Sequence, residues 1–297
     1  MRTAPTRAHN AAVDVGRLSH AVGSGAVLFA GAAATAGEVG ARARNRALLR
    51  RSDGRRARCA GRIVRQQPQV HHPVRGRIKG VRPFEAFVIE TNAWLSQCNV
   101  SVEDVDDVLA GRHGFGEVVL HICGKTGRVD LPVAIVADKQ SDGRIDELRI
   151  YFSSWPLTGR HANRPPLLQP DPQLRESDVV AEYQRALSAG DVDAIVAAFE
   201  ADGYAREPAG AQYVHTGPEG LRAFYGRLFS NGGGIRLERC ALIDGTRSCA
   251  LEYNVVRWGK TELQPEAGVA VYVRGPSGRL AAARIYDDVN PPLDPRM

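Results

Sequence analysis

A repeat inside the chain is the feature that most restricts its fold. The stretch "SDGRIDELRIYFSSWPL" at 141–157 resembles "PSGRLAAARIYDDVNPPL" at 276–293. Both copies contain Gly-Arg followed by Ile or Leu, then Arg-Ile-Tyr, then a proline five residues after the tyrosine. A second pair of similar stretches, 70–87 and 214–229, precedes these copies. The repeat predicts two related structural units joined in one chain.

The repeat divides the 297-residue chain into four segments. Residues 61–160 and 176–293 are the two expected units, and 161–175 is a linker whose prolines indicate an extended conformation. Residues 1–60 are rich in Ala, Arg and Gly, with Phe29 as the single aromatic side chain. This composition predicts an atypical, disordered segment, so we expect the first unit to be degenerate at its N-terminus.

The order of patterns in the second unit predicts an α+β fold. Ser177, Asp191 and Pro218 mark the starts of three helices, at 178–190, 192–201 and 218–229. Alternating stretches with turn residues between them then predict an antiparallel meander, at 235–243, 248–258, 267–274 and 279–289. Helices packed in such a curved sheet form a cone-shaped barrel, which binds small apolar molecules at its open end. The segment 203–217 is expected to be a loop.

Charge and cysteine content restrict the partners and the compartment. Residues 1–82 hold 17 Lys/Arg against 3 Asp/Glu. This excess is either a basic arm for nucleic acid or a solvated tail, and we expect the tail. The five cysteines contain no C-x-x-C pair, which argues against a disulfide framework or a zinc site and favours reduced, cytoplasmic thiols.

Other motifs that would indicate a cofactor or a membrane are absent from the sequence. There is no Gly-rich phosphate loop and no His/Cys cluster with metal spacing, so we expect no nucleotide or metal cofactor. The apolar run at 25–37 is similar to the hydrophobic part of a signal peptide, but a long segment containing Asp14 precedes it. We therefore expect a cytoplasmic protein without membrane spans.

Three stretches of the second unit resemble one family. They are "VVAEYQRALSAGDVDAIVAAF" at 179–199, "REPAG" at 206–210 and "LRAFY" at 221–225. They resemble the first two helices, the acid-proline loop and the third helix of ketosteroid isomerases. These isomerases belong, with the SnoaL-like polyketide cyclases, to the nuclear transport factor 2-like superfamily. The resemblance covers most of 176–293, and its middle strands match only in pattern.

The resemblance implies a proton-transfer site. Glu207, directly before a proline, takes the place of the general base, and Tyr183 takes the place of the oxyanion donor. The third member, a protonated Asp, aligns near Val269, which cannot donate. Glu266 lies on the other face of a regular strand. The residues alone leave open whether Glu207 is a base or a loop carboxylate paired with Arg206, and whether Tyr183 lines a pocket or belongs to the core.

Further residues are candidates for the pocket wall. Tyr204 accompanies Glu207 in its loop, and aromatic side chains that belong either to the core or to the wall are Phe199, Phe224 and Trp258. In "ARIYDD", Arg284, Tyr286 and Asp288 share one strand face. If the family's inward face carries over, Arg284 and Tyr286 point into the cone. Asp288 and Arg284 would then form, with Glu207, a carboxylate–arginine site similar to that of epoxide hydrolases.

The first unit lacks these features. Aligning "IVRQQP" at 63–68 with "GYAREP" puts Gln67 opposite Glu207, and an amide cannot act as a base. We expect this unit to pair with the second unit within the chain, or the protein to form a homodimer. The leading hypothesis is a cofactor-free isomerase or cyclase acting on a small apolar molecule. The alternatives are a non-catalytic ligand-binding or protein-docking module and an epoxide hydrolase-like site.

Overall fold

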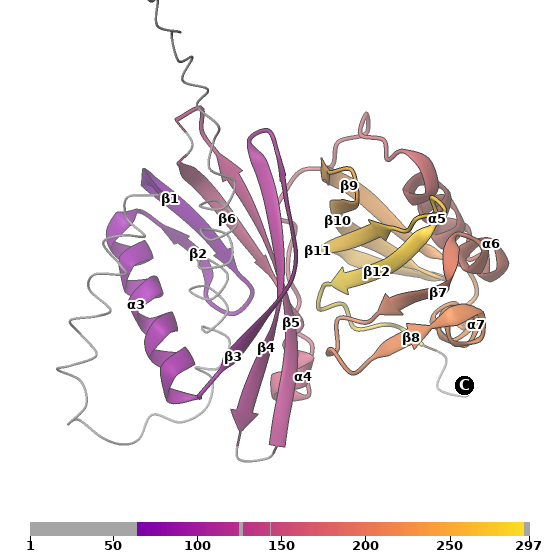
Figure 1. The fold of residues 1–297 in the computed structure, drawn as a ribbon, viewed down its shortest axis with the longest axis horizontal. Helices are drawn as coiled ribbons and strands as arrows, with labels where there is room; N and C mark the ends of the chain where they lie inside the picture. The colour runs from indigo at the N-terminus through magenta and orange to yellow at the C-terminus, as the bar shows by residue number, and fades with distance from the viewer. Residues whose placement is uncertain (1–63, 125–126, 143, 294–297) are drawn as a thin grey trace, which may run out of the picture.

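The computed structural model describes residues 64–124, 127–142 and 144–293, and these form two α+β units. Each unit is a six-stranded sheet with helices on one face, and the other faces of the two sheets pack against each other (Figure 1). The predicted segment 1–60 lies outside the described residues. Within the described part of the chain, no helix combines the length and apolarity that a bilayer crossing requires.

The first unit is a sheet with one long helix. Its strand order is β2-β1-β6-β5-β4-β3. The helix α3 (Val81–Gln97) packs on the sheet through Phe84, Phe87 and Val88, which are spaced as on one helical face. The short helix α4 (Trp155–Thr158) follows the last strand. The strands are β1 (Val64–His72), β2 (Gly76–Lys79), β3 (Ser101–Ala110), β4 (His113–Gly124), β5 (Gly127–Lys139) and β6 (Ile145–Tyr151).

The second unit repeats this arrangement and adds helices at its start. Its strand order, β8-β7-β12-β11-β10-β9, is the order of the first sheet, which confirms the tandem repeat. In both sheets the first strand pairs in parallel with the last and the other pairs are antiparallel. The elements are α5 (Asp178–Ala189), α6 (Val192–Ala197), β7 (Phe199–Arg206), β8 (Val214–Thr216), α7 (Gly217–Leu228), β9 (Ile235–Asp244), β10 (Ser248–Trp258), β11 (Thr261–Arg274) and β12 (Leu280–Tyr286).

The second unit contains the three predicted helices and the four-stranded meander, and two predictions about the segment between the second and third helices were wrong. The segment 203–217, predicted as a loop, contains the end of β7 and all of β8. The strand β7 begins at Phe199, so the second helix ends before the predicted 201. Because β7 pairs with β12, which is far away in sequence, no local pattern announces it.

Strand register corrects the alignment of the two units. His71 pairs with Arg149 in the first sheet, and Arg206 pairs with Arg284 in the second. Because Arg149 and Arg284 are equivalent in the repeat, the residue equivalent to Glu207 is His72. The alignment of Gln67 with Glu207 was therefore wrong by five residues. It relied on the similarity of the stretches 63–68 and 203–208, which strand pairing does not support.

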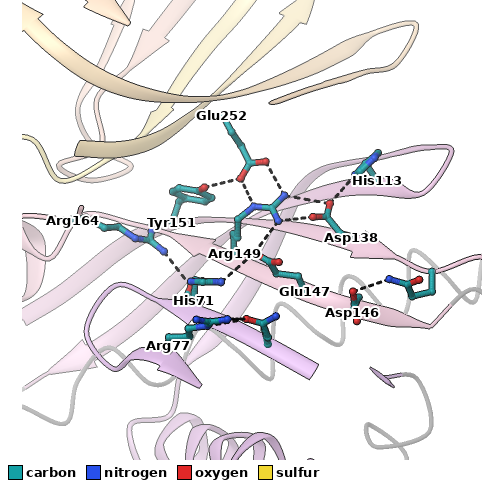
Figure 2. A network of polar contacts seen from close by, with 12 residues as sticks. His71, Arg77, His113, Asp138, Asp146, Glu147, Arg149, Tyr151, Arg164 and Glu252 are labelled. Carbon is teal, nitrogen blue, oxygen red and sulfur yellow. Dashed lines mark hydrogen bonds and ion pairs between the residues drawn. The ribbon is translucent and has the colours of Figure 1, made fainter. Parts of the chain in front are cut away.

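The two units meet across a layer of buried side chains. An apolar cluster joins the facing sheets and includes Phe115, Val136, Ile243, Val269 and Val271. Two matching polar contacts cross the same interface. Arg149 and Tyr151 of the first unit bind Glu252 of the second (Figure 2), and Arg284 and Tyr286 of the second unit bind Glu117 of the first. The interface therefore has approximate two-fold symmetry within a single chain.

Candidate active site

The second unit encloses a cavity of about 360 Å³ between its sheet and the helices α5 and α7. This volume is in the range of small-molecule sites. Most of the wall is apolar, and its aliphatic part includes Leu187, Leu228, Ile235, Leu237, Val255 and Ile285. Of the three aromatic residues that the sequence left open between core and wall, Phe224 and Trp258 line the cavity. Phe199 lies in the core against Tyr183, with ring centroids 5.9 Å apart.

Glu207 lies directly after β7 and lines the cavity. Its Oε1 contacts His215 Nε2 at 2.6 Å and Arg227 Nη2 at 3.1 Å. The imidazole of His215 stacks on Phe224 with ring centroids 4.2 Å apart. Glu207 is thus an ion-paired carboxylate inside the cavity, held by two side chains from α7 and the segment before it.

Arg206, which the sequence left open as a partner of Glu207, points to the opposite side of the strand. Its guanidinium lies over the ring of Tyr286, 4.8 Å from the centroid. Consecutive residues of a strand face opposite sides of a sheet, so Glu207 and Arg206 cannot pair.

Tyr183 lines the cavity from α5, at the position that the resemblance implied. Its hydroxyl lies 2.8 Å from that of Tyr225, which comes from α7. Burial raises the pKa of Tyr183 to about 12, and the bond to Tyr225 opposes this shift. At neutral pH both hydroxyls therefore keep their protons, one donates to the other, and one donor remains for a ligand in the cavity.

Asp287 is a cavity residue that the sequence analysis missed. It follows β12, is buried, and accepts a hydrogen bond of 2.8 Å from the hydroxyl of Tyr253. Burial raises the pKa of Asp287 to about 6, while the hydrogen bond from Tyr253 opposes the rise. The structure thus contains a buried carboxyl group of the kind that was sought near Val269 and Glu266.

Gly268 was the sequence feature that could have indicated the buried carboxyl group of Asp287. Gly268 lies in the interior of β11 and pairs with Tyr253. A Cβ atom there would lie 2.6 Å from the Tyr253 ring and 2.9 Å from Asp287 Cβ. A glycine inside a strand indicates that another group approaches closely, here Tyr253 and Asp287.

The prediction that Arg284 and Tyr286 lie on the inward face of β12 was wrong. They lie on its outward face. Arg284 and Tyr286 bind Glu117 of the first unit, and Tyr204 accepts a hydrogen bond of 3.2 Å from Arg284 Nη1. The two side chains do share one face of the strand, as predicted, but that face points away from the cone. The outward faces of the two sheets are buried against each other. The carboxylate–arginine site built on Arg284 and Asp288 therefore does not form in the cone.

Asp288 also lies outside the cavity wall. It is 4% exposed and accepts hydrogen bonds from Ser153, Ser154, His161 and Ala162, which belong to the end of the first unit and the linker. Its role is to fasten that segment to the second unit.

The first unit lacks both carboxyl groups at the equivalent positions. His72 replaces Glu207, and Phe152, which follows the repeated tyrosine, replaces Asp287. His72 is buried between the rings of Phe87 and Phe152, at centroid distances of 5.6 and 5.5 Å. Burial, and then the charges of Arg164 and Arg75, lower the pKa of His72 to about 3, so it is neutral.

Comparison with known protein families gives a match within the second unit. Residues 180–282 match the SnoaL-like domain family. No curated protein matched this chain.

Many solved structures are similar to this chain. The epoxide hydrolase/cyclase-like enzyme SalBIII, described in pyran ring formation in the polyether salinomycin, is 23% identical; the alignment covers 37% of this chain and 87% of that chain, with a TM-score of 0.32. A putative polyketide cyclase from Sinorhizobium meliloti is 18% identical, with 37% and 94% covered and a TM-score of 0.32. A protein with a ketosteroid isomerase-like fold from Catenulispora acidiphila is 16% identical, with 39% and 90% covered and a TM-score of 0.34.

Proposed function

Because the second unit is a SnoaL-like domain, we propose that it is a cofactor-free isomerase or cyclase that moves a proton on a small, mostly apolar carbonyl compound in its cavity. Removing a proton from carbon next to a carbonyl requires a base and a donor for the developing oxyanion, both shielded from water. The cavity offers two carboxyl groups of different character, with tyrosine hydroxyls beside them.

The observation that carries the proposal is the buried Asp287. A carboxyl group with a pKa of about 6 exists in both protonation states near neutral pH. In its protonated form such a carboxyl group can donate a hydrogen bond to an oxyanion that develops beside it. Buried carboxyl groups that serve only packing are rare because burial disfavours their charge.

The second carboxyl group completes the pair. Glu207 is ion-paired with Arg227, which suits the carboxylate form of a base. In the proposed step, Glu207 takes a proton from the carbon next to the carbonyl, and the electron pair moves to the oxygen. Protonated Asp287 donates a hydrogen bond to that oxygen, and Tyr183 supplies a second donor. Glu207 then returns the proton to a different carbon, so the isomer forms with no net gain or loss of protons.

The test is deuterium exchange with a β,γ-unsaturated steroid ketone in D₂O, followed by NMR. The wild-type protein should form the conjugated isomer, with deuterium at the carbon that receives the proton to the extent that Glu207 exchanges its proton with D₂O before returning it. Glu207→Gln, which removes the base, should lower the rate by about 10²-fold or more. Asp287→Ala, which removes the donor, should lower it by about 10²–10³-fold. Asp193→Asn is the matched control, because this carboxylate is 85% exposed on α6 and should leave the rate unchanged.

Binding separates the proposal from the alternative of a non-catalytic module. Titration of the saturated ketone by calorimetry measures binding without turnover. If the wild type binds the saturated ketone but forms no conjugated isomer from the unsaturated one, the cavity is a binding site and the catalytic proposal is wrong.

A further inference from the structure

The linker supplies a histidine to the cavity of the second unit. His161 follows α4 and lines the cavity, although it lies outside the matched residues 180–282. Its Nδ1 atom lies 3.0 Å from Oδ1 of Asp288. We propose that Asp288 and His161 form a second acid–base pair, which activates water and hydrolyses esters of short apolar acids in this cavity. This activity goes beyond the proposed isomerisation, and none of its steps uses Glu207.

Asp288 is a buried carboxylate that accepts hydrogen bonds on both oxygens. It is 4% exposed, and the hydroxyls of Ser153 and Ser154 donate to it at 2.6 Å, as does the backbone N–H of Ala162 at 2.8 Å. A carboxylate only accepts hydrogen bonds, so Nδ1 of His161 carries the hydrogen of its contact with Asp288. This tautomer leaves a lone pair on the other ring nitrogen, Nε2.

The Nε2 atom of His161 is free to act on a ligand. It makes no hydrogen bond to any residue in the ranges 64–124, 127–142 and 144–293. Asp288 lies behind the cavity wall, so the ring edge opposite Nδ1, which carries Nε2, is the edge left for the cavity. Trp155, which also lines the cavity, lies nearly parallel to the imidazole at 6.5 Å and 27°. The acid and the indole together fix the orientation of the base.

Two other histidine–carboxylate pairs lack this combination. His215 uses its Nε2 atom to bind Glu207 at 2.6 Å, so that nitrogen is occupied. His113 binds Asp138 through Nδ1 at 2.7 Å, but it is 54% exposed and does not line the cavity (Figure 2). His161 therefore joins a buried carboxylate to an unpartnered Nε2 at an apolar cavity, the arrangement by which an acid orients a histidine base.

The proposed hydrolysis balances with water as the only co-reactant. Nε2 takes a proton from water, and the water oxygen bonds to the ester carbonyl carbon while the C=O electron pair moves to the oxygen. That pair then returns, the C–O bond to the alcohol breaks, and the imidazolium gives its proton to the leaving oxygen. Asp287, one residue before Asp288 and in the cavity wall, is a donor to the carbonyl oxygen when it is protonated.

The experiment follows release of 4-nitrophenol from 4-nitrophenyl butyrate by the full chain. The wild type should hydrolyse this ester with saturation kinetics. His161→Gln removes the base and should lower kcat/KM by about 10²-fold or more. His113→Gln is the matched control, since it breaks a histidine–aspartate pair away from the cavity and should leave the rate unchanged.

Two further measurements separate catalysis from packing. Imidazole added to His161→Gly should restore part of the hydrolysis in proportion to its concentration, because it replaces the missing base. Asp288→Asn removes the charge that orients His161, and it should lower kcat by about tenfold or more while KM changes by less than about twofold. A merely structural role of Asp288 would instead raise KM as the wall loosens.

The outcomes are distinct from those of the isomerase test. Hydrolysis that is equal in the wild type and His161→Gln, no saturable hydrolysis by the wild type, or a loss in His161→Gly that imidazole does not restore would each overturn the inference. If hydrolysis depends on His161 in a protein that forms no conjugated isomer, the acid–base pair stands and only the isomerase proposal fails.

Discussion

Gly268 and Asp287 are neighbours that constrain each other. A Cβ atom at Gly268 would lie 2.9 Å from Asp287 Cβ and 2.6 Å from Tyr253 Cε2, distances that side-chain carbons do not reach without displacement. The glycine in β11 thus leaves the space in which Tyr253 donates its hydrogen bond to Asp287. The buried carboxyl group and the residue that makes room for it come from adjacent strands.

Gly268→Ala should damage both stability and the proposed site. Overpacking at this contact should lower the free energy of unfolding by about 1–3 kcal/mol. It should also lower deuterium exchange, because Tyr253 and Asp287 must move. Gly226→Ala is the matched control, since a Cβ there meets nothing within 4 Å and alanine favours the helix α7 by about 1 kcal/mol. Wild-type stability and exchange in Gly268→Ala would contradict this account.

Much of the fold could be predicted from the sequence, because its signals are local. The repeated Arg-Ile-Tyr motif predicted two units. Helix-capping residues located α5 and α7, and alternation of apolar and polar residues located the meander. The strand β7 was missed because its partner, β12, lies about 80 residues further along the chain, and pairing at that distance leaves no local pattern.

The candidate site was harder to predict than the fold. Alternation along the strand showed that Arg284 and Tyr286 share a face. Only the packing of the two sheets decides whether that face contacts the cavity or the other unit. Asp287 was missed for the same reason, because its side chain lies on the opposite face from Arg284 and Tyr286 and lines the cavity. Glu207 and Tyr183 were found from resemblance, and the part of the wall supplied by Trp155 depends on contact between units that no single-unit pattern contains.

The buried charge pairs predict strong dependence of each unit on the other. Glu117 accepts hydrogen bonds from Arg284 and Tyr286, and its side chain is fully buried. Glu117→Gln should cost about 3–5 kcal/mol of unfolding free energy, because Arg284 is left as a poorly compensated buried charge. Glu252→Gln should act in the same direction but cost less, because Arg149 keeps its hydrogen bonds to Asp138 (Figure 2).

Urea unfolding measures these losses. The double variant Glu117→Gln/Arg284→Gln should recover part of the loss, since it removes both members of the pair. Arg222→Gln is the control, because its partner Asp193 is 85% exposed and the pair should contribute less than about 1 kcal/mol. If Glu117→Gln costs no more than this control, the pair does not stabilise the interface.

Asp287 should make the second unit less stable as pH rises. Its pKa is about 6 in the folded protein, above the ordinary 3.8, so between these values the folded state holds a proton that the unfolded chain has released. Stability is therefore lost as pH rises from about 4 to 6, by about 3 kcal/mol in total. The difference in unfolding free energy between wild type and Asp287→Asn should fall by that amount between pH 4 and 7. A difference that stays constant would show that Asp287 titrates normally.

His72 should act in the opposite direction in the first unit. Its pKa is lowered from 6.5 to about 3, so below pH 6.5 the unfolded chain binds a proton that the folded protein excludes. Stability is complete above pH 6.5 and is lost as pH falls, by about 1.4 kcal/mol per pH unit. The Nδ1 atom accepts hydrogen bonds from the backbone amides of Val74 and Arg75, which fixes the neutral form.

Urea unfolding of wild type and His72→Gln between pH 4.5 and 7 checks this effect. The stability advantage of the wild type should shrink by about 2–3 kcal/mol from pH 6.5 to 4.5. Because His72 and Asp287 lie in different units, the double variant His72→Gln/Asp287→Asn should show the sum of the two pH effects. A pH-independent difference for His72→Gln would mean that the buried imidazole is protonated as readily in the folded protein as in the unfolded chain. A double variant that departs from the sum would instead show that the two sites are coupled through the interface.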